Sequence, residues 1–562
     1  MKNRLFFIHK HLLVLFLSGL CFSCTINKTS KGAVVSARAE ASKIGVSIME
    51  KGGTAFDAMI ATDLALAVCY PNAGNIAGGG FLVFRKADGE VGTLDYREKA
   101  PMAATRDLYL DDEGNVIPGK STMGGLAVGV PGTVAGLYEI HQRFGTMKWE
   151  DLVQPAIDLA TNGYVVTAKQ GRSFASSREK FIKVNGENTF YANTFKEGDL
   201  VSNLAIAKTL TFISKMGRDG FYKGPVADAL VARVAATGGI ITHEDLSEYS
   251  PVWRDAINFK YKDLNIFSMA PPSSGGVCLG QILQMVAPYP IDEYGHNSLK
   301  TIQVIVEAER RSYADRSEYL GDPDFVEVPV NELLDNNYLT DRMESFSFDA
   351  ATPSSEVSSG NVIWNESEET THYSIVDPMG NAVAVTTTLN GGYGSKVFVE
   401  EGGYFLNNEM DDFSSKPGVP NMFGLIGSEA NSIVPQKRML SSMTPTIIEK
   451  NGELSMVVGT PGGSTIITSV LQTILNVYDF KMDMQTAVNA PRFHHQWLPD
   501  MVILEPQKFD SLLIDQLSEK GYNIIEKYSR IIGRVDAIYV DENKVISTGA
   551  DPRGDDTATL LY

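Results

Sequence analysis

The chain has 562 residues, of which 43% are hydrophobic and 21% are charged. This balance is typical of a globular protein, and it excludes a largely disordered chain and a membrane protein with many spans. The formal net charge of −19 argues against nucleic acid or an anionic membrane surface as the main partner, because both repel an acidic protein.

The first 24 residues have the layout of a secretory signal peptide. A basic start precedes an apolar run at 12–20, which is too short to span the ~30 Å hydrocarbon core of a membrane. Phe22-Ser23-Cys24 follows and resembles a bacterial lipoprotein processing site. We therefore expect residues 1–23 to be a signal peptide and Cys24 to be the lipidated first residue of an exported, periplasmic protein. A soluble exported protein that is cut near Cys24 is the alternative.

Hydrophobic periodicity predicts helices and strands in mixed order along the chain. Helical patterns dominate from about 130 to 345, and the Ser- and Glu-rich residues 351–369 are expected to form an exposed segment. The expected helices are 33–51, 55–68, 133–144, 227–236, 299–319 and 466–477, and the expected strands are 81–85, 91–96, 371–376 and 382–389. The architecture is therefore mixed α and β.

Three patterns that could suggest a ligand or a crosslink receive plainer interpretations. The glycine run 78–80 lacks the spacing of a phosphate loop, so we assign it to close backbone packing. His494-His495 lacks a third ligand nearby, and adjacent side chains point in different directions, so no metal is implied. Cys69 and Cys278 could form one disulfide or could be two buried thiols.

The stretch EETTHYSIVDPMGNAVAVTTTLNG at 368–391 places threonines at the start of one expected strand and the end of the next. Threonine is common in strands, because its β-branched side chain packs well on a pleated surface. Its hydroxyl can instead be a nucleophile. If the peptide bond before Thr370 is cut, the freed α-amino group, with a reference pKa of about 7.7–8.0, can accept the hydroxyl proton. The stretch alone is compatible with either role.

Seven motifs in chain order resemble landmarks of the γ-glutamyltranspeptidases, which are N-terminal-nucleophile hydrolases made as one self-cleaving precursor. The resemblance extends from Gly32 to Tyr562. The motifs are LDYREKAP (94–101), TTHYSIVD (370–377), LNNEMDDFSSKPG (406–418), LSSMTPT (440–446), GTPGGS (459–464), NAPRFHHQWLPD (489–500) and DPRGDD (551–556). The implied fold is α+β, a four-layer αββα sandwich of two stacked sheets flanked by helices.

The resemblance implies that Thr370 is the nucleophile and that the bond between Glu369 and Thr370 is the self-cleavage site. A large subunit, 24–369, and a small catalytic subunit, 370–562, would then form one intertwined heterodimer. Thr388 matches a second threonine that hydrogen-bonds the nucleophile.

The Pro-Gly-Gly turn would supply the donors that stabilise the oxyanion. Gly462 and Gly463 match these donors, and glycine suits the role because backbone N–H groups must approach the oxyanion closely. A turn that only links a strand to the following helix is the plainer interpretation.

Six further residues match positions that bind the glutamyl group of the substrate. Arg97 matches an arginine that grips the α-carboxylate, for which a planar fork is well suited. Asn390 matches an asparagine at the α-amino and α-carboxylate region. Acidic and hydroxyl groups complete the resemblance: Glu409 and Asp412 match acceptors of the α-ammonium group, and Ser441 and Ser442 match a pair that binds the carboxylate.

The sequence departs from many bacterial members of this family at a lid over the glutamyl pocket. The corresponding loop is 417–427, where Phe423 occupies the place of a tyrosine that hydrogen-bonds the asparagine at position 390. Phenylalanine keeps the apolar cover and loses the hydroxyl. We therefore expect a looser gate and a shift between hydrolysis and transfer.

The expected reaction is cleavage of the γ-glutamyl amide bond of glutathione and related compounds through a γ-glutamyl ester on Thr370. Water, an amino acid or a dipeptide then accepts the glutamyl group, and no metal or organic cofactor is needed. Two alternatives remain at this stage: a cephalosporin-acylase-type amidase of the same fold, and a non-catalytic exported binding homologue.

Overall fold

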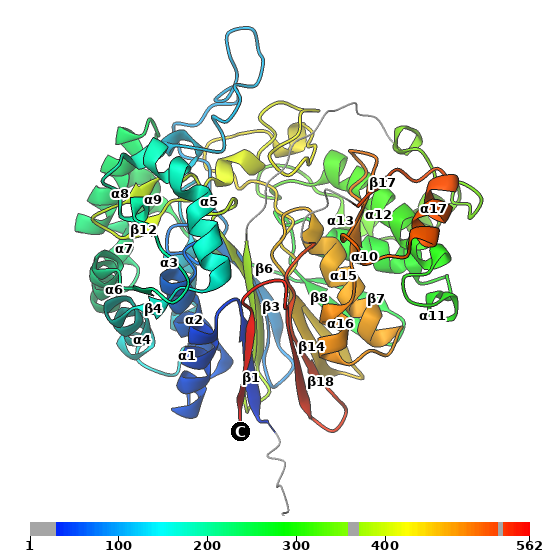
Figure 1. Ribbon diagram of the computed structural model, residues 1–562, viewed down its shortest axis with the longest axis horizontal. Helices are drawn as coiled ribbons and strands as arrows, with labels where there is room; N and C mark the ends of the chain where they lie inside the picture. Colours follow the sequence, from blue (N-terminus) through cyan, green and yellow to red (C-terminus); the bar gives the residue numbers. More distant parts are fainter. Residues whose placement is uncertain (1–29, 358–369, 527–531) are drawn as a thin grey trace, which may run out of the picture.

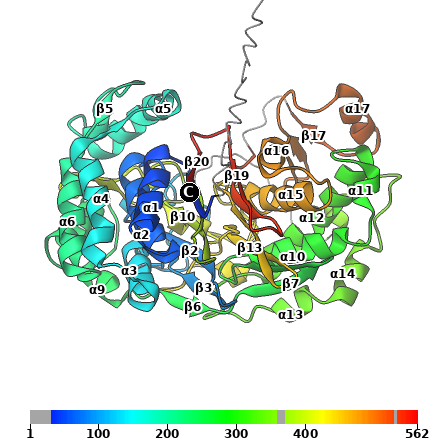
Figure 2. The same ribbon diagram turned by 90° about the horizontal axis from the view of Figure 1, so that it is seen from below.

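The computed structural model describes residues 30–357, 370–526 and 532–562 (Figure 1). The expected signal peptide 1–23, Cys24 and Glu369 lie outside the described residues. Two large sheets stack face to face at the centre, and helices cover the outer face of each, which confirms the expected αββα sandwich (Figures 1 and 2). Within the described residues, no helix is both long enough and apolar enough to cross a membrane.

The first sheet has seven strands in the order β20-β1-β9-β10-β2-β3-β6, and every neighbouring pair is antiparallel. Its strands are β1 (Gly32–Ser36), β2 (Gly79–Arg85), β3 (Val91–Asp95), β6 (Val252–Arg254), β9 (Thr371–Val376), β10 (Ala382–Thr388) and β20 (Thr557–Leu561). The two strands that follow Thr370, β9 and β10, are the innermost part of this sheet and are buried along their whole length.

The second sheet has six antiparallel strands in the order β19-β18-β14-β13-β8-β7. Its strands are β7 (Ile257–Tyr261), β8 (Leu264–Ser268), β13 (Thr446–Lys450), β14 (Glu453–Gly459), β18 (Asp536–Val540) and β19 (Ile546–Ala550). Smaller pairings are β4 (Tyr164–Val165) with β5 (Leu200–Val201), β11 (Phe398–Val399) with β12 (Tyr404–Phe405), and β15 (Phe493–His494) with β16 (Val502–Leu504) and β17 (Ile524–Ile525).

The helices form two layers, one on each sheet (Figure 2). On the seven-stranded sheet lie α1 (Ala39–Glu50), α2 (Ala55–Cys69), α3 (Thr133–Phe144), α4 (Trp149–Asn162), α5 (Ala168–Asn185), α6 (Leu204–Met216), α7 (Asp219–Tyr222), α8 (Gly224–Ala236) and α9 (His243–Glu248). On the six-stranded sheet lie α10 (Gly275–Val286), α11 (Ile291–Tyr294), α12 (Leu299–Tyr319), α13 (Val330–Leu333), α14 (Asn336–Met343), α15 (Thr465–Tyr478), α16 (Met484–Asn489) and α17 (Ser511–Glu519).

One predicted element is wrong at its start. The helix expected at 33–51 is a strand, β1, followed by α1. Val34 and Val35 favour a strand, and β1 inserts between β20 and β9, where its backbone groups pair on both sides. Tertiary pairing therefore overrides the small-residue pattern that suggested one continuous helix.

Buried side chains fill the space between the two sheets and the space between each sheet and its helices. Side chains between the two sheets form one apolar cluster that includes Val376 and Ala384 from the first sheet and Val457 from the second. Side chains on the opposite faces of β9 and β10, such as Tyr373, pack against the first helical layer. This alternation is what a strand buried on both faces requires, because successive side chains point to opposite faces of a sheet.

His372 joins the two sheets at the end of the inter-sheet space that is nearest to Thr370. Its ring nitrogens contact the hydroxyls of Thr386 (2.9 Å) and Ser374 (3.1 Å), and Ser374 in turn donates to the carbonyl of Asp536 in the second sheet (3.0 Å). Burial lowers the pKa of His372 to about 3, so the ring is neutral. His372 is therefore a fixed polar link between the sheets and not a base.

The close approach of the sheets around His372 is tested by Gly459→Ala. A Cβ at Gly459 would overlap the imidazole ring of His372, so we expect the change to destabilise the protein by about 1–3 kcal/mol, measured as a lower Tm. The matched control is Gly171→Ala inside α5, where the nearest atom to a new Cβ lies at 3.4 Å. This control should be neutral or stabilising by up to about 1 kcal/mol. Equal Tm values for the two variants would contradict the packing described here.

Candidate active site

A narrow pocket lies at the end of the inter-sheet space and collects residues from segments far apart in the chain. Its cavity volume is about 20 Å³, which is room for about one water molecule. The lining residues are Arg97, Arg316, Thr370, Thr388, Asn390, Glu409, Asp412, Phe423, Leu425, Ser441, Ser442, Met443, Gly463 and Ile466. The residues matched from the sequence motifs on both sides of the expected cleavage site therefore meet in one place. A glutamyl group is larger than this cavity.

Thr370 stands immediately before β9 and is almost buried. It continues the alternation that points His372 toward the space between the sheets, which brings its side chain to the pocket. Its hydroxyl forms no hydrogen bond with another described residue, and the Nη2 of Arg534 approaches its carbonyl oxygen at 3.5 Å. A hydroxyl left without a partner at the rim of a pocket is available to react.

Thr388 ends the neighbouring strand, β10, and faces the same space as Thr370. Its hydroxyl accepts the backbone N–H of Asn390 at 2.7 Å. The glycine run 78–80 makes this position possible, because a Cβ at Gly78 would overlap the carbonyl oxygen of Thr388 and one at Gly80 would lie 2.6 Å from that of Thr386. The expected close backbone packing of this run is therefore confirmed.

Gly462 and Gly463 form the turn between β14 and α15, directly beside the pocket. Their φ angles of 141° and 52° are conformations that L-residues rarely adopt. A Cβ at Gly463 would also lie 2.6 Å from the ring of Phe423. Among the described residues, no acceptor binds the N–H of either glycine. Two adjacent free N–H groups at a fixed turn are the arrangement that stabilises an oxyanion.

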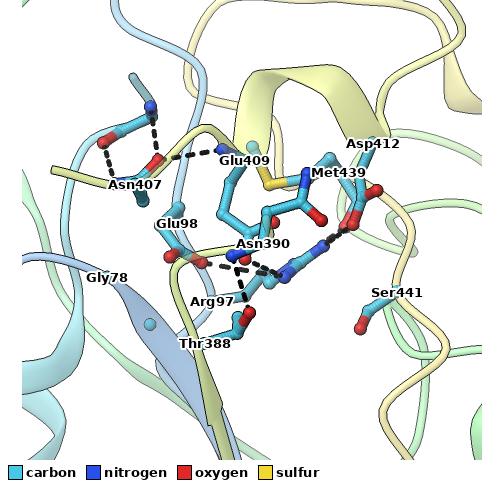
Figure 3. A network of polar contacts seen from close by, with 12 residues as sticks. Gly78, Arg97, Glu98, Thr388, Asn390, Asn407, Glu409, Asp412, Met439 and Ser441 are labelled. Atoms are coloured by element: carbon cyan, nitrogen blue, oxygen red, sulfur yellow. Dashed lines mark hydrogen bonds and ion pairs between the residues drawn. The ribbon is translucent and has the colours of Figure 1, made fainter. Parts of the chain in front are cut away.

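Arg97 follows β3 and is the buried cation at the centre of the pocket (Figure 3). Its guanidinium contacts Asp412 at 2.5 Å and Glu409 at 2.9 Å, and Glu98 lies at 3.8 Å. It also donates to the backbone carbonyls of Met439 and Leu440. Burial alone would lower the pKa of Arg97, yet the surrounding carboxylates raise it above its ordinary value. Arg97 therefore stays charged.

The three carboxyl groups around Arg97 are held in a dry environment that disfavours their charged forms. Burial raises the pKa values of Glu409 and Asp412 above their ordinary values, although Arg97 opposes the shift. Burial also raises the pKa of Glu98 to about 8, so this side chain is mostly protonated at neutral pH. Glu409 and Asp412 line the pocket, where a substrate ammonium group would compensate their charge.

The two serines and Asn390 occupy the remaining wall of the pocket. Ser441 accepts the N–H of Met443 at 3.1 Å. Asn390 has a φ of 72° and donates its side-chain amide to the carbonyl of Asn408 at 3.1 Å. These contacts fix the side chains in position beside Arg97 (Figure 3).

Arg316, from α12, is a pocket residue that the sequence motifs did not single out. It is buried and donates to the hydroxyls of Ser442 (3.1 Å) and Ser274 (2.9 Å). No carboxylate of a described residue lies within ion-pair distance of it, and burial lowers its pKa. Glu98 was missed as well, although it stands next to Arg97 in the motif LDYREKAP. With Arg316, the pocket lining has two cations and two carboxyl groups.

The loop 417–427, which the resemblance matches to a lid, contributes Phe423 and Leu425 to the lining of the pocket. Phe423 is buried against Gly463. Two hydrogen bonds hold the loop: the N–H of Met422 donates to the carboxylate of Asp411 (2.9 Å), and the side-chain amide of Asn421 donates to that of Asp412 (3.1 Å). The sulfur of Met422 lies 3.8 Å from the side-chain nitrogen of Asn390. The lid therefore reaches Asn390 through a thioether, where the resemblance predicts a tyrosine hydroxyl.

Other residues that the sequence singled out have structural roles. Cys69 and Cys278 are buried free thiols, so the disulfide alternative is excluded. The ring of His494 contacts Thr468 and Gln496, both at 2.9 Å, and His495 contacts Asp500 at 3.2 Å. These contacts are those of polar groups satisfied inside the fold.

Comparison with known proteins identifies the group to which this arrangement belongs. A family model described as gamma-glutamyltranspeptidase matches residues 41–561. The glutathione hydrolase proenzyme of Escherichia coli is 41% identical over 99% of both chains. The enzyme of the same name from Pseudomonas aeruginosa is 44% identical over 96% of this chain and 95% of its own.

Solved structures agree with the sequence comparison. The cephalosporin acylase of Bacillus halodurans matches 94% of this chain and 96% of its own with a TM-score of 0.83, at 25% identity. The γ-glutamyltranspeptidase of Helicobacter pylori has a TM-score of 0.56 at 43% identity, and covers 57% of this chain and 94% of its own. The sequence match over nearly the whole length, together with this fold and pocket, shows that the chain belongs to the γ-glutamyltranspeptidase family.

Proposed function

We propose that the protein cleaves the γ-glutamyl amide bond of glutathione and related compounds through a γ-glutamyl ester on Thr370. The observation that carries the proposal is the pocket itself, where a free hydroxyl, the Gly463 end of a turn with two free backbone N–H groups, and a buried arginine with two carboxyl groups come together. A γ-linked glutamate has a free α-carboxylate and a free α-ammonium group, and these match Arg97 and the pair Glu409 and Asp412.

The nucleophile is made by cleavage of the bond between Glu369 and Thr370. The products are the large subunit 24–369 and the small subunit 370–562, which remain together because both sheets contain strands from each. The new α-amino group of Thr370 accepts the hydroxyl proton, and the oxygen attacks the γ-carbonyl carbon. Gly462 and Gly463 donate their N–H groups to the oxyanion, an interaction worth about 2.7–4 kcal/mol per donor in comparable sites.

Collapse of the tetrahedral intermediate breaks the C–N bond, and the amine leaves with the proton that the α-amino group held. Water, an amino acid or a dipeptide then attacks the ester, the C–O bond breaks, and the oxygen of Thr370 regains a proton. Thr388 orients the nucleophile, and Asn390, Ser441 and Ser442 hold the glutamyl group with Arg97. No step requires a metal or an organic cofactor.

The protein acts outside the cytoplasm. Support comes from the signal-peptide layout of residues 1–23 and from the processing motif that ends at Cys24, which would carry a lipid anchor. The two cysteines of the described residues are buried free thiols, so they do not need an oxidising compartment to form a disulfide.

An amidase acting on a cephalosporin side chain remains the second candidate, because the acylase of B. halodurans has the same fold. The two carboxyl groups beside Arg97 favour a donor with a free ammonium group over one without it. These two buried carboxyl groups share the single guanidinium of Arg97, so a donor without the ammonium group leaves their charge less well balanced and would bind poorly.

Self-cleavage is tested by Thr370→Ala. Denaturing electrophoresis of the wild type should show two fragments that divide at Thr370, whereas the variant should stay a single chain with no γ-glutamyl turnover. The matched control is Thr371→Ala, whose hydroxyl is buried on the adjacent position without a partner among the described residues. This control should be processed normally. A wild type that stays in one piece and has no turnover would favour the non-catalytic homologue.

The pH dependence of donor binding is tested by Glu98→Gln. Because the pKa of Glu98 is raised to about 8, the side chain is neutral below pH 8 and becomes an anion above it. The new charge competes with the donor carboxylate for Arg97, so we expect KM of the wild type to rise about ten-fold more than that of the variant between pH 7 and 9. Glu90→Gln, at an exposed site, should follow the wild type. If KM of the wild type and of Glu98→Gln changes with pH in the same way, ionisation of Glu98 does not control donor binding.

The lid is tested by Phe423→Tyr. A hydroxyl on this ring would restore the group that, in the family resembled, bonds the asparagine matched by Asn390, and such a bond would make opening of the lid less favourable. We expect KM for the donor to fall by about two-fold or more, and the ratio of transfer to hydrolysis to change. The measurement is the initial rate with glutathione, with and without a dipeptide acceptor. Unchanged values for both rates would show that the missing hydroxyl is irrelevant.

A further inference from the structure

A second and larger cavity lies on the other side of the Gly462-Gly463 turn. Its volume is about 420 Å³, within the range of sites for small ligands. Gly462 lines this cavity, and Gly463 lines the glutamyl pocket. Arg534 also lines it and lies 3.5 Å from the carbonyl oxygen of Thr370, so a single side chain connects the cavity with the proposed nucleophile. The two pockets therefore meet at the place where the scissile bond must lie.

The wall of this cavity is basic in a protein that is otherwise acidic. Lys169, Arg172, Arg534 and Arg553 line it, against one acid, Asp555, although the whole chain has 49 basic and 68 acidic residues. A cluster of cations in such a chain indicates an anionic ligand.

Two of these cations have no acidic partner among the described residues. Arg553 is neutralised by Glu505 in a double contact at 2.5 and 2.7 Å. Lys169, on the first turn of α5, donates only to the backbone carbonyls of Pro552 (3.0 Å) and Gly554. Arg172, one turn further along α5, is exposed and forms no hydrogen bond or ion pair with a described residue. Both can therefore bind a carboxylate that arrives from solution.

Part of the cavity wall is aromatic and lies beside the cations: Phe174 is on α5 with Arg172, and Arg534 lies over the ring of Tyr70. Tyr70, Phe174 and Tyr393 line it, and the hydroxyl of Tyr393 contacts Ser173 at 2.8 Å. A fully extended dipeptide spans about 7 Å, so its side chain can contact this wall while its terminal carboxylate reaches the cations. The cavity thus suits an amino acid or short peptide with a free α-carboxylate.

We propose that this cavity binds the amine half of the reaction through its carboxylate, with Arg172 and Lys169 as the binding residues. The inference rests on the proposed function, because it assigns the second half of the same reaction. The dipeptide released from a donor leaves through this cavity, and an acceptor enters it. The acceptor nitrogen attacks the ester carbon, a C–N bond forms, the C–O bond to Thr370 breaks, and one proton of the amine returns to the oxygen.

The test compares glutathione with glutathione whose glycine carboxylate has been converted to an amide. We expect kcat/KM of the wild type to favour the free acid by about ten-fold, and this preference to fall below about three-fold in Arg172→Gln. The matched control is Lys180→Gln, which removes one exposed cation from the same helix outside the cavity and should keep the wild-type preference. The same comparison applies to acceptors: the preference for glycylglycine over its amide should fall in Arg172→Gln and stay at the wild-type level in Lys180→Gln.

Each result has a definite meaning. No preference in the wild type, an unchanged preference in Arg172→Gln, or an equal loss in Lys180→Gln would overturn the assignment of this cavity. Hydrolysis of γ-glutamyl-p-nitroanilide, which carries no carboxylate on its leaving half, is measured for each enzyme in parallel. Its absence in the processed wild type would contradict the proposed function itself, and so the two failures are distinguishable.

Discussion

A buried guanidinium surrounded by carboxyl groups is the interaction on which the rest of the site depends. Arg97 connects the segment after β3 with Glu409 and Asp412 and with the carbonyls of Met439 and Leu440. Burying a charge costs several kcal/mol unless it is paired and hydrogen-bonded, so these segments are stable only when they stay together. The geometry that binds a glutamyl group is thus the same geometry that keeps this region folded.

The two stacked sheets place the reacting groups around this cation. Thr370 and Thr388 face the inter-sheet space because they keep the alternation of β9 and β10, and the Gly462-Gly463 turn follows directly from β14 of the opposite sheet. At this end the ring of His372 packs against Gly459 of the second sheet, and Ser374 donates to the carbonyl of Asp536. The proposed nucleophile therefore comes from one sheet and the proposed oxyanion donors come from the other, so the stacking of the sheets brings these groups together.

The sequence predicted the parts of the fold whose local pattern and tertiary environment agree. The helix at 299–319 and the strands at 371–376 and 382–388 were found with almost the observed bounds. The local pattern of β1 predicts a helix, because the pairing with β9 and β20 that makes it a strand involves residues more than 300 positions away. The close backbone packing of the Gly78–Gly80 run is predictable from the sequence, because glycine has no Cβ to prevent the approach of another strand.

The candidate site was foreseen through ordered motifs, whereas its missed members have no local signal. Arg316 lies in α12, where alternating charges resemble a solvated helix surface, and only the tertiary fold buries it beside Ser442. The basic cavity is built from segments near positions 70, 170, 393, 462, 534 and 553, so no single stretch reveals it. Roles such as the contact of Thr388 with the nucleophile remain predictions, because Thr370 acquires its free amine only after cleavage.

The central claim is that the pocket recognises a glutamyl group by both of its α-substituents. The most direct measurement compares kcat/KM of the processed enzyme for γ-glutamyl-p-nitroanilide and glutaryl-p-nitroanilide. Both compounds have the free carboxylate assigned to Arg97, and they differ only in the α-ammonium group assigned to Glu409 and Asp412. Loss of charged hydrogen bonds worth about 1.5–3 kcal/mol each predicts a preference of about 100-fold or more for the γ-glutamyl compound. Equal rates, or a preference for the glutaryl compound, would contradict the account and favour an acylase.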